Sequence, residues 1–252
     1  MVALAALVLS FARPAASEGL EPEEGVFAGY APPTPYELLV RQALLGDDRY
    51  RLCQMVYLPS FRQESAVYIA HEKGKAFVVV SRTLKKQLWS QMLGEMEKAS
   101  PTKNSISLDS IYQSAALHKI RAAVDTRTAT LDAEVATSVA ETCRDVLLRV
   151  SYPKESTAGL DGTTYHAGHW IPGAFLSGKT WSPTKGTAAA EFVAMEMALQ
   201  AYADSTTKER AALRLDLLEK AKRLKARVNS GPEDPSTPAS PALQTDRASP
   251  GR

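Results

Sequence analysis

The chain has 252 residues, of which 44% are apolar and 23% are charged, close to the averages of folded soluble proteins. These values exclude a wholly disordered chain, a collagen-like fibre and a multi-span membrane protein. The formal net charge of +2 does not by itself indicate a nucleic-acid partner, and two cysteines are too few for a disulfide-rich scaffold or a cysteine-rich zinc module.

The amino terminus predicts export. Residues 2–11 form an unbroken apolar run of the length of a signal-peptide core, too short to span a bilayer. Small residues follow at Ala15 and Ser17, so cleavage is expected after Ser17. No Lys or Arg precedes the run, and a buried amino-terminal strand or helix is the alternative. The prediction is a signal peptide over residues 1–17 and a periplasmic or secreted protein.

The segments that flank the expected domain offer little to a core. Residues 18–33 are acidic and rich in Pro and Gly, which predicts a flexible lead-in. Residues 229–252 hold five of the fifteen prolines and almost no large apolar side chain, which predicts a disordered tail. A single domain is therefore expected over residues 34–228.

The first half of this domain predicts one helix followed by three strands. Thr34 caps a helix that starts with Pro35 and stops at Gly46. Runs rich in aromatic and β-branched residues predict strands at residues 50–58, 66–70 and 76–80. The last two strands form a hairpin around a turn at residues 72–75.

The middle of the chain predicts two helices around an ambiguous segment. Apolar residues at helical spacing predict the first helix, and they are Leu84, Leu88, Trp89, Met92 and Met96. Residues 106–125 mix strand-like and polar pieces and receive no assignment. The second helix is predicted over residues 131–150, with Val139 and Cys143 on its core stripe.

The second half predicts a hairpin and two helices. Residues 163–170 and 174–181 read as strands between turn signals, and a helix follows over residues 187–203. Thr206 and Glu209 fit a capping box that opens the last helix. Strands and helices come in clumps, so we expect an α+β fold: a largely antiparallel sheet of two hairpin-containing halves, covered by helices.

His166 and His169 are the first candidates for chemistry. On a helix this spacing places two imidazoles on one face, where they can share a metal ion. The neighbouring Thr, Tyr and Gly residues favour a strand, in which the two side chains alternate, so no metal site is predicted. Either histidine alone is a candidate general acid or base, with Asp161 or Glu191 as the carboxylate that orients it.

Residues 173–180 (GAFLSGKT) satisfy the P-loop pattern GxxxxGK[ST]. A phosphate-binding loop needs a helix to begin at its Lys-Thr step, but Trp181, Ser182 and Pro183 follow directly. The prediction is a strand, and neither a nucleotide nor another cofactor is expected.

The two cysteines allow two structures. Cys53 falls on a predicted strand and Cys143 on the core stripe of a predicted helix. A disulfide fits an exported protein, and two buried free thiols fit the usual burial of cysteine. The sequence leaves both open.

The last helix carries the clearest charge signal. Residues 207–228 contain eight basic and three acidic side chains, a net +5, which leaves −3 for the rest of the chain. Its apolar stripe consists of Leu213, Leu217, Ala221, Leu224 and Val228. Such a helix packs on an acidic body, on a partner helix or on an anionic membrane surface, and contact with a membrane surface stays open. Nucleic acid is not expected.

The expected function is binding rather than catalysis, because the chain has no GxSxG elbow, HExxH helix or CxxC pair. We expect an exported non-catalytic protein that binds another macromolecule, such as an inhibitor or immunity-type protein of the cell envelope. The expected surface is the second hairpin, with Tyr165, His166, His169, Trp170, Lys179 and Trp181. Two alternatives remain: the tryptophans fill the core, or the protein is an exported hydrolase that uses His166 or His169.

Overall fold

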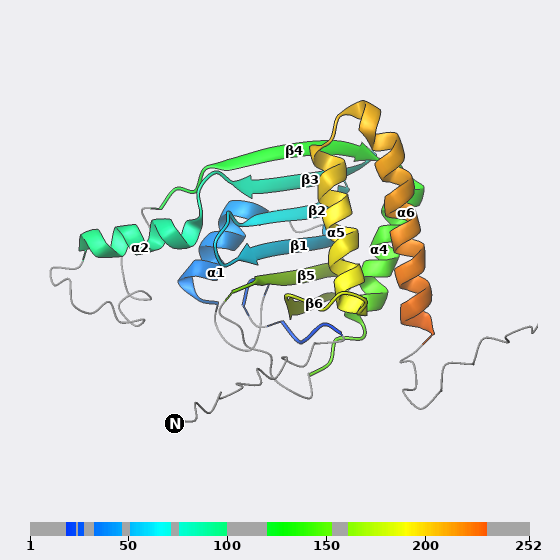
Figure 1. The fold of residues 1–252 in the computed structure, drawn as a ribbon, viewed down its shortest axis with the longest axis horizontal. Helices are drawn as coiled ribbons and strands as arrows, with labels where there is room; N and C mark the ends of the chain where they lie inside the picture. The colour runs from blue at the N-terminus through cyan, green and yellow to red at the C-terminus, as the bar shows by residue number, and fades with distance from the viewer. Residues whose placement is uncertain are drawn as a thin grey trace, which may run out of the picture.

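The protein is described here by a computed structural model of residues 19–23, 25–27, 33–46, 51–71, 76–99, 120–152 and 161–230 (Figure 1). The predicted signal peptide, nearly all of the predicted tail, and the turn at 72–75 lie outside these residues.

Six strands form one sheet in which every neighbouring pair is antiparallel. The strands are β1 (Arg51–Pro59), β2 (Ser65–His71), β3 (Phe77–Leu84), β4 (Val124–Leu131), β5 (Thr163–Ile171) and β6 (Ala174–Trp181). Their order is β4-β3-β2-β1-β5-β6, so a four-stranded meander joins the later hairpin through β1. The predicted α+β fold with a two-part antiparallel sheet is confirmed.

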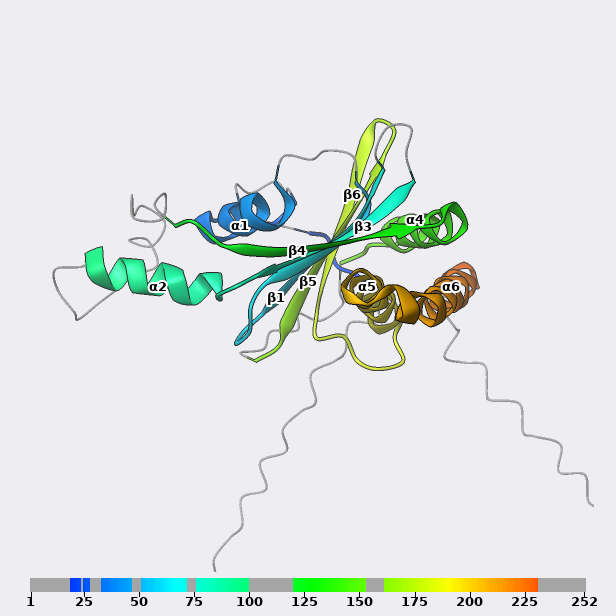
Figure 2. The same cartoon turned by 90° about the horizontal axis from the view of Figure 1, so that it is seen from above.

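The helices divide between the two faces of the sheet. They are α1 (Pro35–Val40), the π-helical turn η1 (Arg41–Leu45), α2 (Leu88–Ala99), α4 (Ala133–Leu147), α5 (Ala188–Asp204) and α6 (Thr207–Asn229). Seen from above, α4, α5 and α6 lie together on one side, whereas α1 lies on the other and α2 extends past the strands (Figure 2).

Two cores result from this division. The first core lies between the sheet and α4, α5 and α6, and it contains Cys53, Met55 and Phe192, all fully buried. The second core lies between the opposite face and α1, η1 and α2, and it contains Val56 and Leu88. Neighbouring residues of β1 thus serve opposite cores, as strand alternation requires.

Helix ends follow the local sequence. Capping boxes form at Thr34 with Glu37 and at Thr206 with Glu209, as predicted, and Thr187 accepts from the Ala190 amide. The first helical segment ends at Gly46, whose φ of 65° favours glycine.

Two expectations for the middle of the chain differ from the structure. Leu84 is the last residue of β3 and does not begin the predicted helix. Its amide donates to the Glu64 carbonyl, and Leu84 pairs with Val124 of β4. Residues 126–130 form most of β4, which the sequence did not predict. This strand was missed because it is an exposed edge strand with many polar residues, so its sequence shows little alternation of apolar and polar side chains. Its threonines are nevertheless common in strands.

The amino-terminal residues 19–23 and 25–27, called here the strap, pack on the sheet instead of forming the flexible lead-in expected there. Glu21 forms a two-bond bridge with Lys179 of β6, at 2.8 Å in both directions. Leu20 enters the first core, whereas Val26 and Phe27 enter the second. The strap thus crosses the edge of β6, and burial of these three apolar side chains offsets the entropy of ordering the segment.

Candidate functional site

The two histidines of β5 point to opposite faces of the sheet. His166 lies opposite Val56, a second-core residue, on β1, whereas the next residue Ala167 lies opposite Met55 of the first core. His169 shares the face of Ala167 and lies close enough to Arg144 and Asp145 of α4 to feel their charges. The predicted divergence of the two imidazoles is confirmed.

His166 meets a carboxylate that sequence reasoning did not find. Its Nδ1 lies 2.7 Å from Glu23 Oε1 of the strap, and both side chains are buried. The other oxygen of Glu23 accepts from the Phe27 amide at 3.3 Å. The three apolar residues of the strap could have indicated that this segment is ordered, because a flexible segment gains nothing from large apolar side chains.

His169 is held in its neutral form. Burial lowers its pKa to about 4, the positive charge of Arg144 contributes to the lowering, and Asp145 opposes it. Its Nδ1 is buried and has no hydrogen-bond partner among the described residues.

The other two catalytic candidates do not meet the histidines. Asp161 is exposed in the turn before β5. Glu191, in the first turn of α5, forms ion pairs with Arg227 at 3.2 Å and with Arg223 at 4.0 Å. The carboxylate beside His166 is Glu23, so neither of the candidates proposed from sequence orients that ring.

The six residues of the expected binding surface are divided between the two faces. Cross-strand pairing puts Lys179 and Trp181 on the face of His166, together with Trp170, whereas Tyr165 and His169 face the first core. Tyr165 makes an edge contact with Tyr57, with ring centroids 5.6 Å apart. Both histidines are buried, and of the six only Trp170, at 38%, has an exposed side chain.

The segment that matches the P-loop pattern is the hairpin turn and β6. Lys179 pairs with His166 on one side and with the backbone of Glu21 on the other, and the strand continues through Thr180 to Trp181. The amides of this segment serve the sheet instead of forming a cradle for phosphate, and the strand prediction is confirmed.

The basic helix α6 is paired within the molecule. Its buried residues are Leu217, Ala221, Leu224 and Val228, as the predicted stripe requires. Ion pairs join its basic side chains to neighbouring carboxylates: Arg214 to Asp132 and Glu134, Lys220 to Asp216, Lys225 to Glu141, and Arg223 and Arg227 to Glu191.

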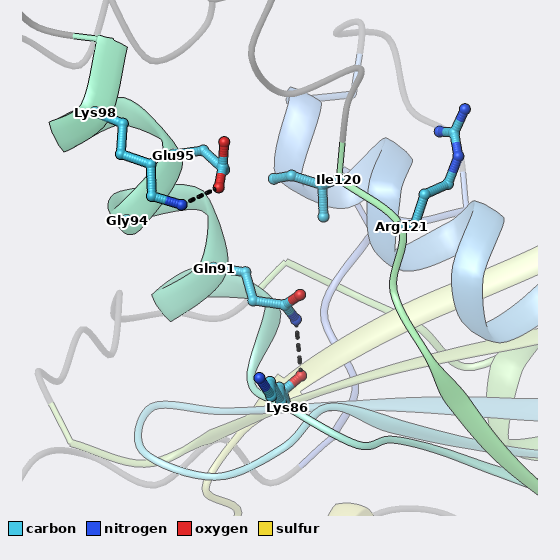
Figure 3. A pocket seen from close by; sticks show the side chains of 7 residues that line it. All are labelled: Lys86, Gln91, Gly94, Glu95, Lys98, Ile120 and Arg121. Atoms are coloured by element: carbon cyan, nitrogen blue, oxygen red, sulfur yellow. Dashed lines mark hydrogen bonds and ion pairs between the residues drawn. The ribbon is translucent and has the colours of Figure 1, made fainter.

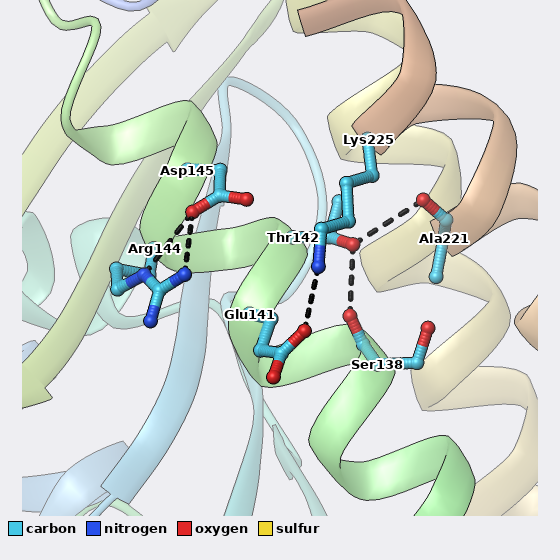
Figure 4. A network of polar contacts seen from close by, with 7 residues as sticks. All are labelled: Ser138, Glu141, Thr142, Arg144, Asp145, Ala221 and Lys225. Atoms are coloured by element: carbon cyan, nitrogen blue, oxygen red, sulfur yellow. Dashed lines mark hydrogen bonds and ion pairs between the residues drawn. The ribbon is translucent and has the colours of Figure 1, made fainter. Parts of the chain in front are cut away.

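Figure 4 shows the middle of this contact between α4 and α6. Lys225 Nζ lies 2.6 Å from Glu141, and the Thr142 hydroxyl lies 3.2 Å from the Ala221 carbonyl. Of the three packings that the charge pattern allowed, these contacts belong to the one on an acidic body.

A shallow pocket of about 380 Å³ lies against α2 (Figure 3). Its lining is mostly polar and basic, and consists of Lys86, Gln91, Gly94, Glu95, Lys98, Ile120 and Arg121. Lys98 pairs with Glu95 at 2.6 Å, and Gln91 donates to the Lys86 carbonyl. None of the lining residues belongs to β5 or β6, so the pocket does not serve the histidines.

The first core holds a disulfide beside a buried acid. Cys53 of β1 and Cys143 of α4 are bonded, which decides between the two structures that the sequence left open. Glu196 of α5 is fully buried, and its Oε1 lies 3.0 Å from Cys53 Sγ. A disulfide sulfur carries no hydrogen, so the carboxyl group must be the donor in this contact.

Burial accounts for the protonation of this acid. It raises the pKa of Glu196 to about 8, and it also raises the pKa of the nearby Tyr57, with Glu196 adding to that effect. Glu196 Oε2 and the Tyr57 hydroxyl have no hydrogen-bond partner among the described residues. Sequence reasoning missed Glu196, although its spacing from Phe192 and Leu199 puts it on the apolar face of a predicted helix.

Comparison of the chain with protein-family models, with curated proteins and with solved structures finds no match. In the part of the chain that the structure describes, no helix has both the length and the apolar character needed to cross a membrane.

Proposed function

We propose that the protein is exported and binds another macromolecule of the cell envelope without catalysing a reaction on it. The supporting observation is an exposed aromatic pair on a firmly tied frame. Phe61, after β1, is 77% exposed, and Trp89, in the first turn of α2, is 37% exposed. Aromatic side chains on rigid elements are typical anchors of protein interfaces.

Two contacts tie the segments that carry these rings to the body of the molecule. Gln87 donates to the Ser60 carbonyl at 2.9 Å, which joins the loop of Phe61 to the start of α2. The Tyr36 ring of α1 meets Trp89 edge-on, with centroids 5.6 Å apart. Binding at this pair therefore orders few additional groups, which keeps its entropy cost low.

A buried carboxylate fixes the start of α2. Glu64 is fully buried and accepts from the amides of Leu88 and Trp89 and from the Tyr36 hydroxyl, at 2.9–3.3 Å. A negative charge at a helix amino terminus is favourable, and here it holds α1, α2 and β2 in one arrangement. Burial and the neighbouring Glu64 charge raise the pKa of Tyr36, so its hydroxyl stays a donor.

The alternative of a hydrolase needs a histidine that reaches a substrate. The His166–Glu23 pair has the geometry of an oriented imidazole, but the strap and the sheet bury both groups. Binding through the exposed aromatic pair asks for no such opening, and we prefer it for that reason.

Affinity capture from the cell envelope, with the protein as bait, tests the proposal. We expect wild type to retain a partner that Phe61→Asp loses, because the charge prevents burial of the ring. Leu215→Asp is the matched control, since Leu215 is 62% exposed on α6 and lies outside the aromatic pair. Both variants should unfold at the wild-type denaturant concentration.

Two results would contradict the proposal. Loss of the partner in Trp170→Ala but not in Phe61→Asp would assign binding to the second hairpin. Recovery of no partner, together with an envelope hydrolase activity that disappears in His166→Ala, would support the enzyme alternative.

A further inference from the structure

Three potential metal ligands from three elements converge in the first core. They are Cys53 of β1, Cys143 of α4 and Glu196 of α5, and all three are fully buried. One ligand atom from each lies within 4.8 Å of the others. In a tetrahedral zinc site with bonds of about 2.3 Å, ligand atoms stand about 3.8 Å apart, a spacing that the two sulfur atoms can reach only after the disulfide is reduced and they separate.

Glu196 has no structural explanation as an ordinary core residue. An acid on the apolar face of α5 costs desolvation, and only Oε1 has a contact, with Cys53 Sγ. By contrast, each of the buried glutamates 23 and 64 uses both of its oxygens in hydrogen bonds. Glu196 Oε2 therefore remains as an unused ligand atom in the core.

His169 is the neighbour of Cys53 across the sheet. Gln54 of β1 pairs with Gly168 of β5, so the same register continued by one residue places His169 opposite Cys53. Its nitrogen atoms are not part of the cluster within 4.8 Å, so the His169 side chain must move to reach an ion bound there. Its buried Nδ1, like Glu196 Oε2 and the Tyr57 hydroxyl, has no hydrogen-bond partner among the described residues. A neutral imidazole is the form in which histidine binds a metal ion.

We propose that, when the Cys53–Cys143 bond is reduced, these two cysteines and Glu196 bind one divalent metal ion of the zinc class, with His169 as the adjacent fourth donor. Two thiolates select a soft or borderline cation, and carboxylate and imidazole complete a donor set typical of zinc. The disulfide and the metal ion use the same sulfur atoms, so each state excludes the other. This proposal is independent of the proposed binding function.

The two states interconvert by a balanced reaction. A phosphine and one water molecule convert the disulfide into two thiols: the phosphine supplies two electrons and becomes the phosphine oxide, and the water supplies the oxygen and two protons. The ion then forms two metal–sulfur bonds, one metal–oxygen bond and one metal–nitrogen bond to the neutral imidazole of His169, and it displaces two thiol protons and the carboxyl proton. Because the ligands are buried, the ion enters as the reduced chain folds, so binding and folding are coupled.

Cobalt(II) is the probe for this site. The protein is unfolded, reduced with a phosphine and refolded without oxygen in the presence of Co²⁺. We expect the near-ultraviolet bands of sulfur-to-cobalt charge transfer and the visible bands of tetrahedral cobalt, saturating at one ion per chain and lost on addition of Zn²⁺. Protein carried through the same steps without reductant is the matched control and should show neither set of bands.

Glu196→Gln tests the carboxylate. The amide keeps the shape of the side chain but is a poor ligand, so we expect Co²⁺ affinity to fall by at least about tenfold. Glu191→Gln, the same change on the same helix, is the control and should bind as wild type does. His169→Ala should also weaken binding and alter the visible bands.

Alkylation with iodoacetamide gives a second measurement that needs no variant. Zn²⁺ should slow the alkylation of Cys53 and Cys143 in the reduced, refolded protein. Equal alkylation with and without Zn²⁺, absence of the charge-transfer bands, or unchanged Co²⁺ affinity in Glu196→Gln would each overturn the proposal.

Discussion

The two faces of the sheet are closed in different ways. On one face, three helices of 15, 17 and 23 residues cover the first core, and a disulfide joins β1 to α4. On the other face, α1 and η1 together have 11 residues, and the strap and α2 complete the cover. Both faces bury apolar area, and a covalent bond is added on the first face, whereas buried polar anchors are added on the second.

The buried glutamates show what this difference means. Glu23 and Glu64, on the second face, use both oxygens to hold segments in place. Glu196, on the first face, anchors no segment and keeps one oxygen without a partner in the described structure. Among these three glutamates, burial thus serves architecture on the second face, whereas on the first face it marks a candidate site.

The largest expected effect comes from removal of the covalent bond on the first face. Cys53→Ala with Cys143→Ala should lower the free energy of unfolding by about 4 kcal/mol, because the bond closes a loop of 90 residues in the unfolded chain. Urea unfolding of the oxidised wild type and of the variant measures the difference. A loss below 1 kcal/mol would mean that packing, not the cross-link, stabilises this face.

The second prediction concerns the pH dependence of the first face in the disulfide-bonded protein. The pKa of Glu196 is about 8 in the folded state and 4.5 in the unfolded chain, so between these values the folded state holds a proton that the unfolded state has released. The contribution of Glu196 to stability is therefore greatest below pH 4.5, and it falls by about 3 kcal/mol between pH 4.5 and 7.5. The lowered pKa of His169 has the opposite effect, because its contribution to stability rises with pH between about 4 and 6.5.

Glu196→Gln separates this effect from other titrations. The variant should lose the decline over that range, and at pH 7.5 it should be more stable than the wild type. Urea unfolding at several pH values measures both quantities. Parallel curves for the two proteins would show that Glu196 does not carry the pH dependence.

On the second face, the strap depends on one buried pair. Glu23→Gln removes the charge opposite His166 and should cost about 2 kcal/mol, the usual value of a hydrogen bond to a charged group. The loss should be local, so hydrogen exchange should speed up at the amides of Glu21 and Lys179. Glu21→Gln is the control, because Glu21 bridges to β6 through its backbone alone. Equal hydrogen-exchange rates in both variants would show that Glu23 does not anchor the strap.

Local signals predicted most of the fold. The caps at Thr34 and Thr206, the second hairpin and the apolar stripe of α6 depend on neighbours in sequence, and the structure contains all of them. Divergence of His166 and His169 followed from strand alternation alone. Each of these features can be predicted from the periodicity of one helix or strand and from the residues at its ends.

The missed features depend on distant contacts. The strap is ordered because β6 lies beside it, 158 residues away at the Glu21–Lys179 bridge. Glu23 and His166, or Cys53 and Glu196, are each 143 residues apart in sequence, and no local pattern links them. The expected binding surface lies on both faces of the sheet, because side chains alternate along a strand. The prediction used this alternation for the two histidines but not for the other four residues.

The smallest expected effect tests the paired surface of α6. Asp132 caps α4 through the Val135 amide and also pairs with Arg214, whose hydrogen bond lowers the pKa of Asp132. Asp132→Asn keeps the cap and removes the ion pair, so it should cost less than about 1 kcal/mol, and 1 M salt should abolish the difference from wild type. Asp132→Ala removes both and should cost about 1 kcal/mol more at any salt concentration. Thermal unfolding at low and high salt measures the contributions of the ion pair and of the cap. A salt-independent loss in Asp132→Asn would mean that the ion pair with Arg214 does not account for the loss.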